Sequence, residues 1–127
     1  MKTTTLKKSS QTEKQVVASC RTYLKKQGWV TKLVYTGGIP IGFGKLAANP
    51  CKGIPDCLAF HVPTQTFLWI EFKKGSGGIL SEEQMAFHAL LRSCGQTVLV
   101  TNSLATLKAQ LNEIAIMKLV NKPDWVG

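Results

Sequence analysis

Residues 66–73 read TFLWIEFK, a run that is apolar on both faces of an extended chain. Alternate side chains of a strand share a face, so Leu68, Ile70 and Phe72 lie on one side and Phe67 and Trp69 on the other. A strand that is apolar on both faces is normally internal to its sheet. Glu71 and Lys73 therefore emerge together on one face, at the rim of a packed core.

The surrounding patterns predict a single α/β domain. Helical spacing of apolar residues marks residues 11–28, 81–95 and 103–120, and β-branched and aromatic runs mark strands in 29–36, 54–62, 66–73 and 96–101. Residues 37–53 are punctuated by Gly and Pro and are predicted as one long loop. The order α-β-β-β-α-β-α favours a central mixed sheet flanked by helices, in a domain over 11–120 with a polar, basic leader at 1–10 and a tail at 121–127.

The charge balance favours a polyanionic partner. Sixteen Lys and Arg against seven Asp and Glu give a net charge of +9, which indicates nucleic acid ahead of an anionic membrane. No apolar run approaches the length of a membrane span, so we expect a cytoplasmic protein of a prokaryotic or phage-infected cell with no membrane partner.

Two cofactor classes are excluded by spacing. The four cysteines form no C-x-x-C pair, and with only two histidines they indicate reduced thiols and no zinc site. Gly42, Gly44 and Lys45 suggest a phosphate-binding loop, but Ile39 and Leu46 occupy positions where that motif needs Gly and Ser or Thr. No nucleotide cofactor is expected.

A second carboxylate changes the interpretation of Glu71 and Lys73, which alone could be a weak surface pair on an edge strand. Asp56 follows Pro55 at the head of the neighbouring strand, where it can face Glu71. A divalent cation relieves the repulsion between two such carboxylates, and Mg²⁺ prefers oxygen ligands, including the backbone carbonyl of Phe72. Lys73 can then stabilise the transition state or help deprotonate an attacking water.

The motifs K-G-I-P-D at 52–56, E-F-K at 71–73 and S-E-E-Q at 81–84, followed by Gly95 and then VLVTNS at 98–103, resemble the VRR-NUC family of PD-(D/E)XK nucleases. The resemblance implies a restriction-endonuclease-like core and DNA hydrolysis dependent on Mg²⁺ or Mn²⁺. It also implies that Asp56 and Glu71 bind metal, that Lys73 is the catalytic lysine, and that Gln84 and Glu13 complete the site.

Several of these residues have competing interpretations. Gln84 lies three residues after Ser81 and can instead close a helix capping box. Glu13 shares a helical face with apolar residues, yet a carboxylate in a first helical turn also favours the helix dipole. His88 lies one turn after Gln84 and either approaches the site or packs as a partly buried histidine, which we favour.

The DNA contacts are expected at Lys45, Lys52, Lys74 and the glycine loop of Gly75, Ser76 and Gly77. Small members of the family resemble Holliday-junction resolvases, which implies branched DNA and a two-fold homodimer, with the last helix or residues 30–35 as the interface. The alternatives are a monomeric nuclease acting on flaps or ends, and a non-catalytic DNA-binding protein on a nuclease fold.

Overall fold

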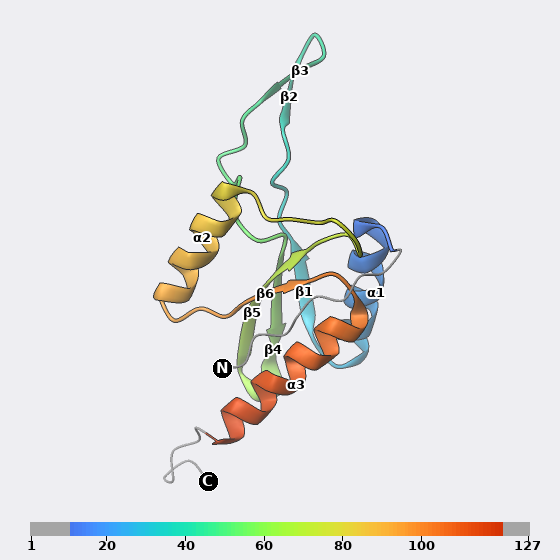
Figure 1. The fold of residues 1–127 in the computed structure, drawn as a ribbon, viewed down its shortest axis with the longest axis vertical. Helices are drawn as coiled ribbons and strands as arrows, with labels where there is room; N and C mark the ends of the chain where they lie inside the picture. The colour runs from blue at the N-terminus through green and yellow to red at the C-terminus, as the bar shows by residue number, and fades with distance from the viewer. Residues whose placement is uncertain (1–10, 121–127) are drawn as a thin grey trace.

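The computed structural model describes residues 11–120, so the predicted leader at 1–10 and tail at 121–127 lie outside the described residues. Three α-helices, one 3₁₀ turn at Val62–Thr64 and six strands follow each other along the described chain (Figure 1). Their bounds are α1 Glu13–Lys26, β1 Val30–Leu33, β2 Ile39–Gly42, β3 Lys45–Ala47, β4 Cys57–His61, β5 Thr66–Phe72, α2 Glu82–Ser93, β6 Val98–Thr101 and α3 Leu104–Val120.

The main sheet is mixed and has the strand order β1-β4-β5-β6. β4 pairs antiparallel with both β1 and β5. β5 pairs parallel with β6, and α2 forms the crossover between these two strands. The prediction of a central mixed sheet with helices is therefore confirmed, and so is the internal position of β5.

One face of the sheet carries the core. α1 and α3 lie across this face (Figure 1), and α1 contributes Val16, Cys20 and Leu24 at helical spacing. These side chains meet the inward-facing residues of β4 and β5, such as Ala59 and Ile70. On α3, Leu107 is buried, and three further apolar residues at helical spacing pack against this core, namely Leu104, Leu111 and Ile114.

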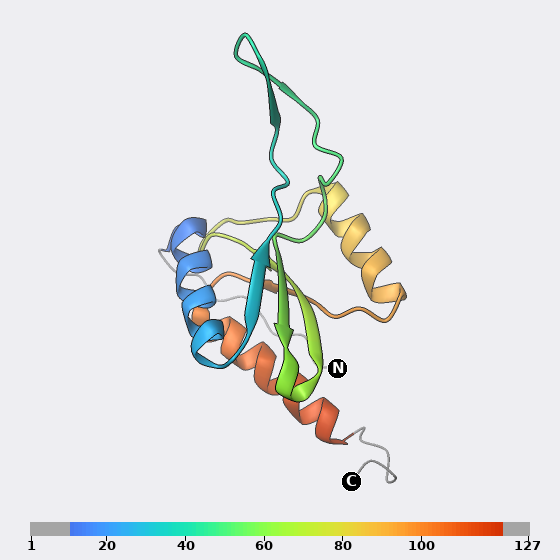
Figure 2. The same ribbon diagram turned by 180° about the vertical axis from the view of Figure 1, so that it is seen from behind.

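The opposite face is covered only in part. α2 lies on this side near β6, and no other helix of residues 11–120 covers β1, β4 or the start of β5 (Figure 2). Val30, Phe60 and Phe67 project from these strands in register and are all exposed. We call these three residues with Trp69 the open sheet face.

The prediction of a loop over residues 37–53 is wrong for its middle part. β2 and β3 pair there as a hairpin, with a bulge between Pro40 and Gly42. Every residue of β2 is exposed, so the hairpin has no buried face and therefore no alternation of apolar and polar residues to reveal it. It projects from the body of the molecule beyond the end of the main sheet (Figure 1).

Two further findings concern the chain's environment. Among residues 11–120, no helix combines the length and apolar character that crossing a membrane requires. The four cysteines, all within this range, are unbridged. Burial in the core raises the pKa of the Cys20 and Cys57 thiols to about 11, so both stay protonated at neutral pH.

Candidate metal centre

The pairing of β4 with β5 brings the first two carboxylates together. Cys57 is opposite Ile70, so Asp56, the residue before β4, comes level with Glu71. The Oδ2 atom of Asp56 accepts a hydrogen bond of 2.9 Å from the backbone N–H of Phe72. The position predicted for Asp56, beside the end of the neighbouring strand, is therefore confirmed.

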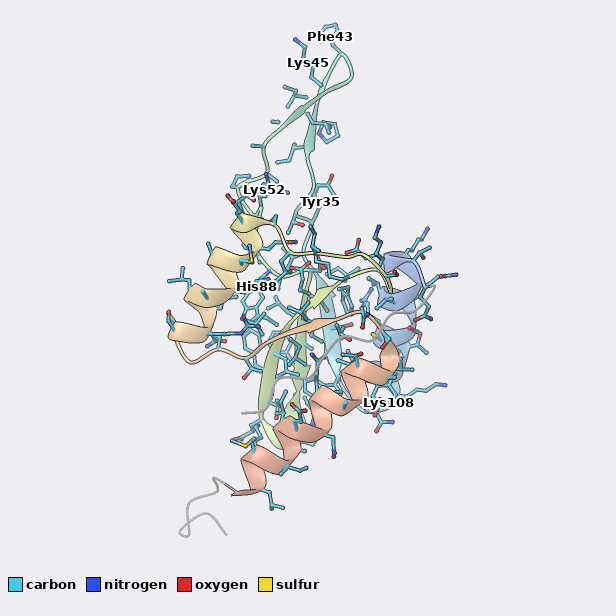
Figure 3. The ribbon with its side chains drawn as sticks, in the orientation of Figure 1. Tyr35, Phe43, Lys45, Lys52, His88 and Lys108 are labelled. Carbon is cyan, nitrogen blue, oxygen red and sulfur yellow. The ribbon has the colours of Figure 1, made fainter. Side chains whose placement is uncertain are left out.

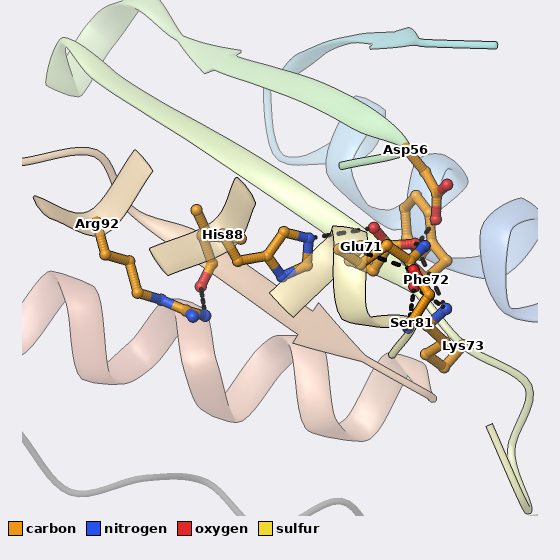
Figure 4. Close-up of polar contacts among 9 residues, drawn as sticks. Asp56, Glu71, Phe72, Lys73, Ser81, His88 and Arg92 are labelled. Carbon is orange, nitrogen blue, oxygen red and sulfur yellow. Dashed lines mark hydrogen bonds and ion pairs between the residues drawn. The ribbon is translucent and has the colours of Figure 1, made fainter. Parts of the chain in front are cut away.

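Glu71 lies deeper than predicted, because its side chain is only 1% exposed. α2 covers it, and three side chains contact its two oxygens (Figure 4). His88 Nε2 lies 3.3 Å from Oε1, while Gln84 Nε2 donates to Oε2 at 3.2 Å and Lys73 Nζ lies 3.8 Å from Oε2. The expectation of a carboxylate at the rim of the core is corrected to a buried carboxylate beneath α2, outside the apolar core cluster.

Gln84 has both of the functions considered for it. Its Oε1 accepts from the backbone N–H of Ser81, and the Ser81 hydroxyl accepts from the Gln84 N–H, which together form a capping box at the start of α2. The same Oε1 accepts a 3.0 Å hydrogen bond from Lys73 Nζ, and Nε2 reaches Glu71. The cap therefore fixes the amide that holds the lysine beside the carboxylate.

Glu13 is the third carboxylate of the group. One carboxylate oxygen each from Glu13, Asp56 and Glu71 lie within 4.8 Å of one another. Glu13 is the first residue of α1 and is exposed, so it closes the group from the solvent side rather than pointing into the core. Three oxygen ligands of this kind match the preference of Mg²⁺ and Mn²⁺.

The protonation of these groups follows from their burial. Burial raises the pKa of Asp56 to about 7, and a hydrogen bond with Glu71 favours its protonated form further. Burial also raises the pKa of Glu71, although the bond with Asp56 and the charge of Lys73 act in the opposite direction. Without a cation, the pair therefore holds a proton on Asp56 near neutral pH, and a cation bound between them would displace it.

His88 contributes more than the packing interpretation allowed. Its ring is fully buried, and burial together with the charge of Arg92 lowers its pKa. The contact with the Glu71 carboxylate requires a proton on Nε2, so His88 donates to Glu71 and orients it. Carboxylates that bind metals are commonly oriented by such hydrogen bonds. The sequence signal was its position one helical turn after Gln84, on the same face of α2.

Glycines pack two of the motif segments against this centre. A Cβ at Gly53 would lie 2.9 Å from the backbone oxygen of Glu83 in the first turn of α2, and a Cβ at Gly78 would lie 2.9 Å from Cβ of Lys73. Neither contact tolerates a side chain. Gly53 thus holds the loop before Asp56 against α2, and Gly78 packs on the lysine.

The residues predicted as DNA contacts do not gather at one place. Lys45 lies near the tip of the hairpin, away from the carboxylates, and Lys52 lies near the start of α2 (Figure 3). Lys52 Nζ is 3.2 Å from Glu83 Oε1, and both side chains are exposed. Lys74 is exposed next to the site. Gly75 is buried, and its backbone N–H donates a hydrogen bond to the Gln11 carbonyl. Ligation by the Phe72 carbonyl stays a prediction, although that residue's N–H faces Asp56.

No protein-family model matches this chain, and neither a curated protein nor a solved structure does.

Proposed function

We propose that the protein is a divalent-metal-dependent DNA phosphodiesterase with a restriction-endonuclease-like core of the VRR-NUC type. The observation that carries this proposal is the grouping of Glu13, Asp56 and Glu71 around one point, with Lys73 fixed beside Glu71. Surface ion pairs do not bury a glutamate to 1% exposure between a lysine, a glutamine and a histidine. The burial of a carboxylate destabilises the fold, so stability does not explain why Glu71 is buried. Binding of a cation explains it better.

The donor set leaves room for a metal. Each oxygen of Glu71 has two lone pairs; His88 engages one on Oε1, and Gln84 engages one on Oε2. Asp56 and Lys73 also approach this carboxylate, so a cation bound among Glu13, Asp56 and Glu71 would replace the proton that the two buried carboxylates share. Mg²⁺ or Mn²⁺ held there supplies a Lewis acid for a phosphate oxygen and lowers the pKa of a bound water.

Lys73 is the residue that can act on the reacting phosphate. Its ammonium group is held by Gln84 and Glu71, and its side chain is still 13% exposed, so the group reaches the surface of the site. A fixed positive charge at that point stabilises the negative charge that develops on a phosphorane-like transition state. Gln84 and His88 do not need to touch DNA, because they position Lys73 and Glu71.

The overall charge supports a nucleic acid as the substrate. The net charge is +9 although three of the seven acidic residues belong to the metal centre. The remaining surface is thus strongly basic around an acidic site, which suits a polyanion that is cut with the help of a cation.

The test is a cleavage assay with labelled four-way junction, flap, single-stranded and linear duplex DNA, each with Mg²⁺, Mn²⁺ or EDTA. We expect the wild type to cut at least one branched substrate with either metal and none in EDTA. Lys73→Ala should bind the same DNA with unchanged affinity and cut it at least about 100-fold more slowly. Lys25→Ala, which removes an exposed lysine from the end of α1, is the matched control and should cut normally.

Two outcomes would overturn the proposal. If the wild type binds DNA but cuts none of the four substrates with either metal, the protein is a binding protein on this fold. If Lys73→Ala cuts as well as Lys25→Ala, then Lys73 has no function in the chemistry.

A further inference from the structure

The tip of the β2–β3 hairpin presents a single bare aromatic ring. Phe43 is fully exposed, and the residues on either side of it, Gly42 and Gly44, have no side chains that could shield the ring (Figure 3). A Cβ placed at either glycine would meet no other atom of residues 11–120 within 4 Å. The tip is therefore narrow, and the ring of Phe43 is its most prominent group.

The turn at the tip does not explain why a phenylalanine is there. The two residues that join β2 to β3 both have a positive φ, 53° at Phe43 and 70° at Gly44. A hairpin turn of this kind favours Asn, Asp or Gly at its first residue, because a larger side chain is strained in the left-handed region. Strained residues often lie at functional sites, so the ring indicates a function beyond the turn.

The hairpin starts and ends beside the metal centre. Where β1 ends, the backbone N–H of Val34 donates a 2.7 Å hydrogen bond to the carbonyl of Asp56. On the returning side, Lys52 pairs with Glu83 in the first turn of α2, the helix that covers the centre. The hairpin therefore projects from the end of the sheet that carries the carboxylates, and DNA bound at the centre would lie next to it (Figure 1).

Hydrogen bonds at the base of the hairpin fix its direction. The Asn49 side-chain amide donates to the carbonyls of Tyr35 at 2.9 Å and Gly37 at 3.0 Å. Its Oδ1 accepts from the N–H of Cys51 at 2.8 Å, and the Tyr35 hydroxyl donates to the Gly38 carbonyl at 2.6 Å. These bonds join the outgoing strand to the returning one, so the tip keeps its place relative to the metal centre.

The composition of the hairpin favours stacking on bases over contacts with their edges. Residues 39–47 read IPIGFGKLA, in which Lys45 has the only side chain that can form a hydrogen bond. Base edges are recognised through hydrogen bonds, whereas the flat face of a base stacks on an aromatic ring. Proteins also insert apolar side chains between base steps. In a chain with a net charge of +9, a narrow apolar tip with Lys45 beside it suits nucleic acid better than a flat protein surface.

A branch point is where such a ring enters DNA most easily. Insertion into a continuous duplex has to separate two stacked base pairs, whereas at a branch the stack is already interrupted. From Val34 to Phe43 the extended chain covers roughly 30 Å, at about 3.3 Å per residue. That length corresponds to about nine base pairs of duplex, at roughly 3.4 Å each. The tip can therefore meet a branch several base pairs from a phosphate held at the metal centre.

We propose that Phe43 stacks on the base pair exposed at a branch of the DNA, and that this contact makes the protein prefer branched over continuous duplex DNA. The inference rests on the proposed function for its substrate, because it names the residue by which the same metal centre selects its DNA. Phe43 positions the DNA and takes no part in the chemistry. The preference is therefore measurable without metal and without cleavage.

Fluorescence anisotropy in EDTA, with a labelled four-way junction and a linear duplex of the same sequence, measures the preference. We expect the wild type to favour the junction by about 5–100-fold, the worth of one base–aromatic stack, and Phe43→Ala to bind both DNAs alike. Phe43→Trp keeps an aromatic ring and should keep the preference, whereas Lys45→Ala should weaken binding to both DNAs equally. Leu119→Ala is the matched control, because this exposed apolar residue lies near the end of α3, away from the hairpin, and its loss should change neither affinity.

A photo-crosslink tests where the tip lies. A chain carrying p-benzoylphenylalanine at position 43 is bound to the same junction in EDTA and irradiated, and the crosslinked nucleotides are mapped. We expect crosslinks to the nucleotides that flank the branch. The same amino acid at position 119 should give none.

Three results overturn the proposal. They are a wild type that binds junction and duplex alike, a Phe43→Ala variant that keeps the wild-type preference, and crosslinks that are absent or spread along the junction arms. The second result would assign the apolar hairpin to a protein partner instead. A protein that cuts junctions while Phe43→Ala keeps the preference rejects this inference alone, whereas one that crosslinks at the branch and cuts no DNA rejects the proposed function alone.

Discussion

The metal centre and the β2–β3 hairpin, whose residues 35–48 we call the arm, deviate from the usual distribution of residues in opposite ways. At the metal centre, Glu71 is buried with His88 and Gln84 around it, whereas in the arm Phe43 and Ile41 are exposed with nothing around them. Buried charge and exposed apolar side chains are both unfavourable for an isolated chain. The comparison separates a region whose geometry is fixed by buried contacts from one whose side chains face solvent.

The largest difference between the two regions should be in stability. His88→Ala removes a fully buried ring and its contact with Glu71, so we expect it to lower the free energy of unfolding by about 3 kcal/mol. Phe43→Ala removes a fully exposed ring and should change that free energy by less than about 0.5 kcal/mol. Urea unfolding in EDTA measures both. An equal loss in both variants would remove the contrast between the regions.

The second prediction concerns pH, because burial shifts the pKa values of Asp56, Glu71 and His88 in the metal centre. The pKa of Asp56 is about 7 in the fold against an ordinary value near 3.8, so the folded state holds this proton more tightly. In metal-free protein, this residue's contribution to stability is full below about pH 4 and is lost as the pH rises to about 7, a decrease on the order of 4 kcal/mol. His88 has a lowered pKa and shifts stability in the opposite direction, so the wild-type profile alone does not isolate Asp56.

The variant Asp56→Asn separates the pH dependence that Asp56 contributes from that of His88. The amide keeps an oxygen for the Phe72 N–H but cannot ionise, so the variant should gain stability relative to the wild type as the pH rises from 4 to 8 in EDTA. Leu46→Asn in the arm is the comparison and should run parallel to the wild type at every pH. A constant difference between Asp56→Asn and wild type across this range would mean that Asp56 is ionised without a metal.

Part of the metal centre was predictable from the sequence alone. The two apolar faces of residues 66–73 were enough to predict an internal strand, and Pro55 was enough to predict Asp56 at the start of the next one. The depth of Glu71 was missed, because it depends on α2 folding over the sheet, a long-range contact that periodicity does not contain. The same limit explains why packing was favoured for His88.

The arm was missed for a different physical reason. Helices and strands are recognised in a sequence by the alternation that a buried face imposes, and β2 buries nothing within its own chain. Its Gly and Pro residues then dominate the pattern and indicate a loop. A strand with no buried face is hidden from sequence analysis in this way.

The smallest effect separates the two functions of Gln84. Ser81→Ala removes the cap acceptor for the Gln84 N–H and should cost about 1 kcal/mol of stability with little change in cleavage. Gln84→Ala removes a similar part of the capping box and also releases Lys73 and Glu71, so cleavage should fall by about 10–100-fold. Stability and turnover are measured on both variants. Equal cleavage rates would reduce Gln84 to a capping residue.

The central claim is that the buried charge is a metal site, and the most direct test is calorimetric titration of Mn²⁺ into the DNA-free protein at pH 8. We expect saturable binding by the wild type, its loss in Glu71→Gln and Asp56→Asn, and no change in Glu82→Gln, which alters an exposed carboxylate on α2 outside the group. Weak binding by the wild type that Glu71→Gln and Glu82→Gln reproduce equally would contradict the account, because the three carboxylates would then hold no cation.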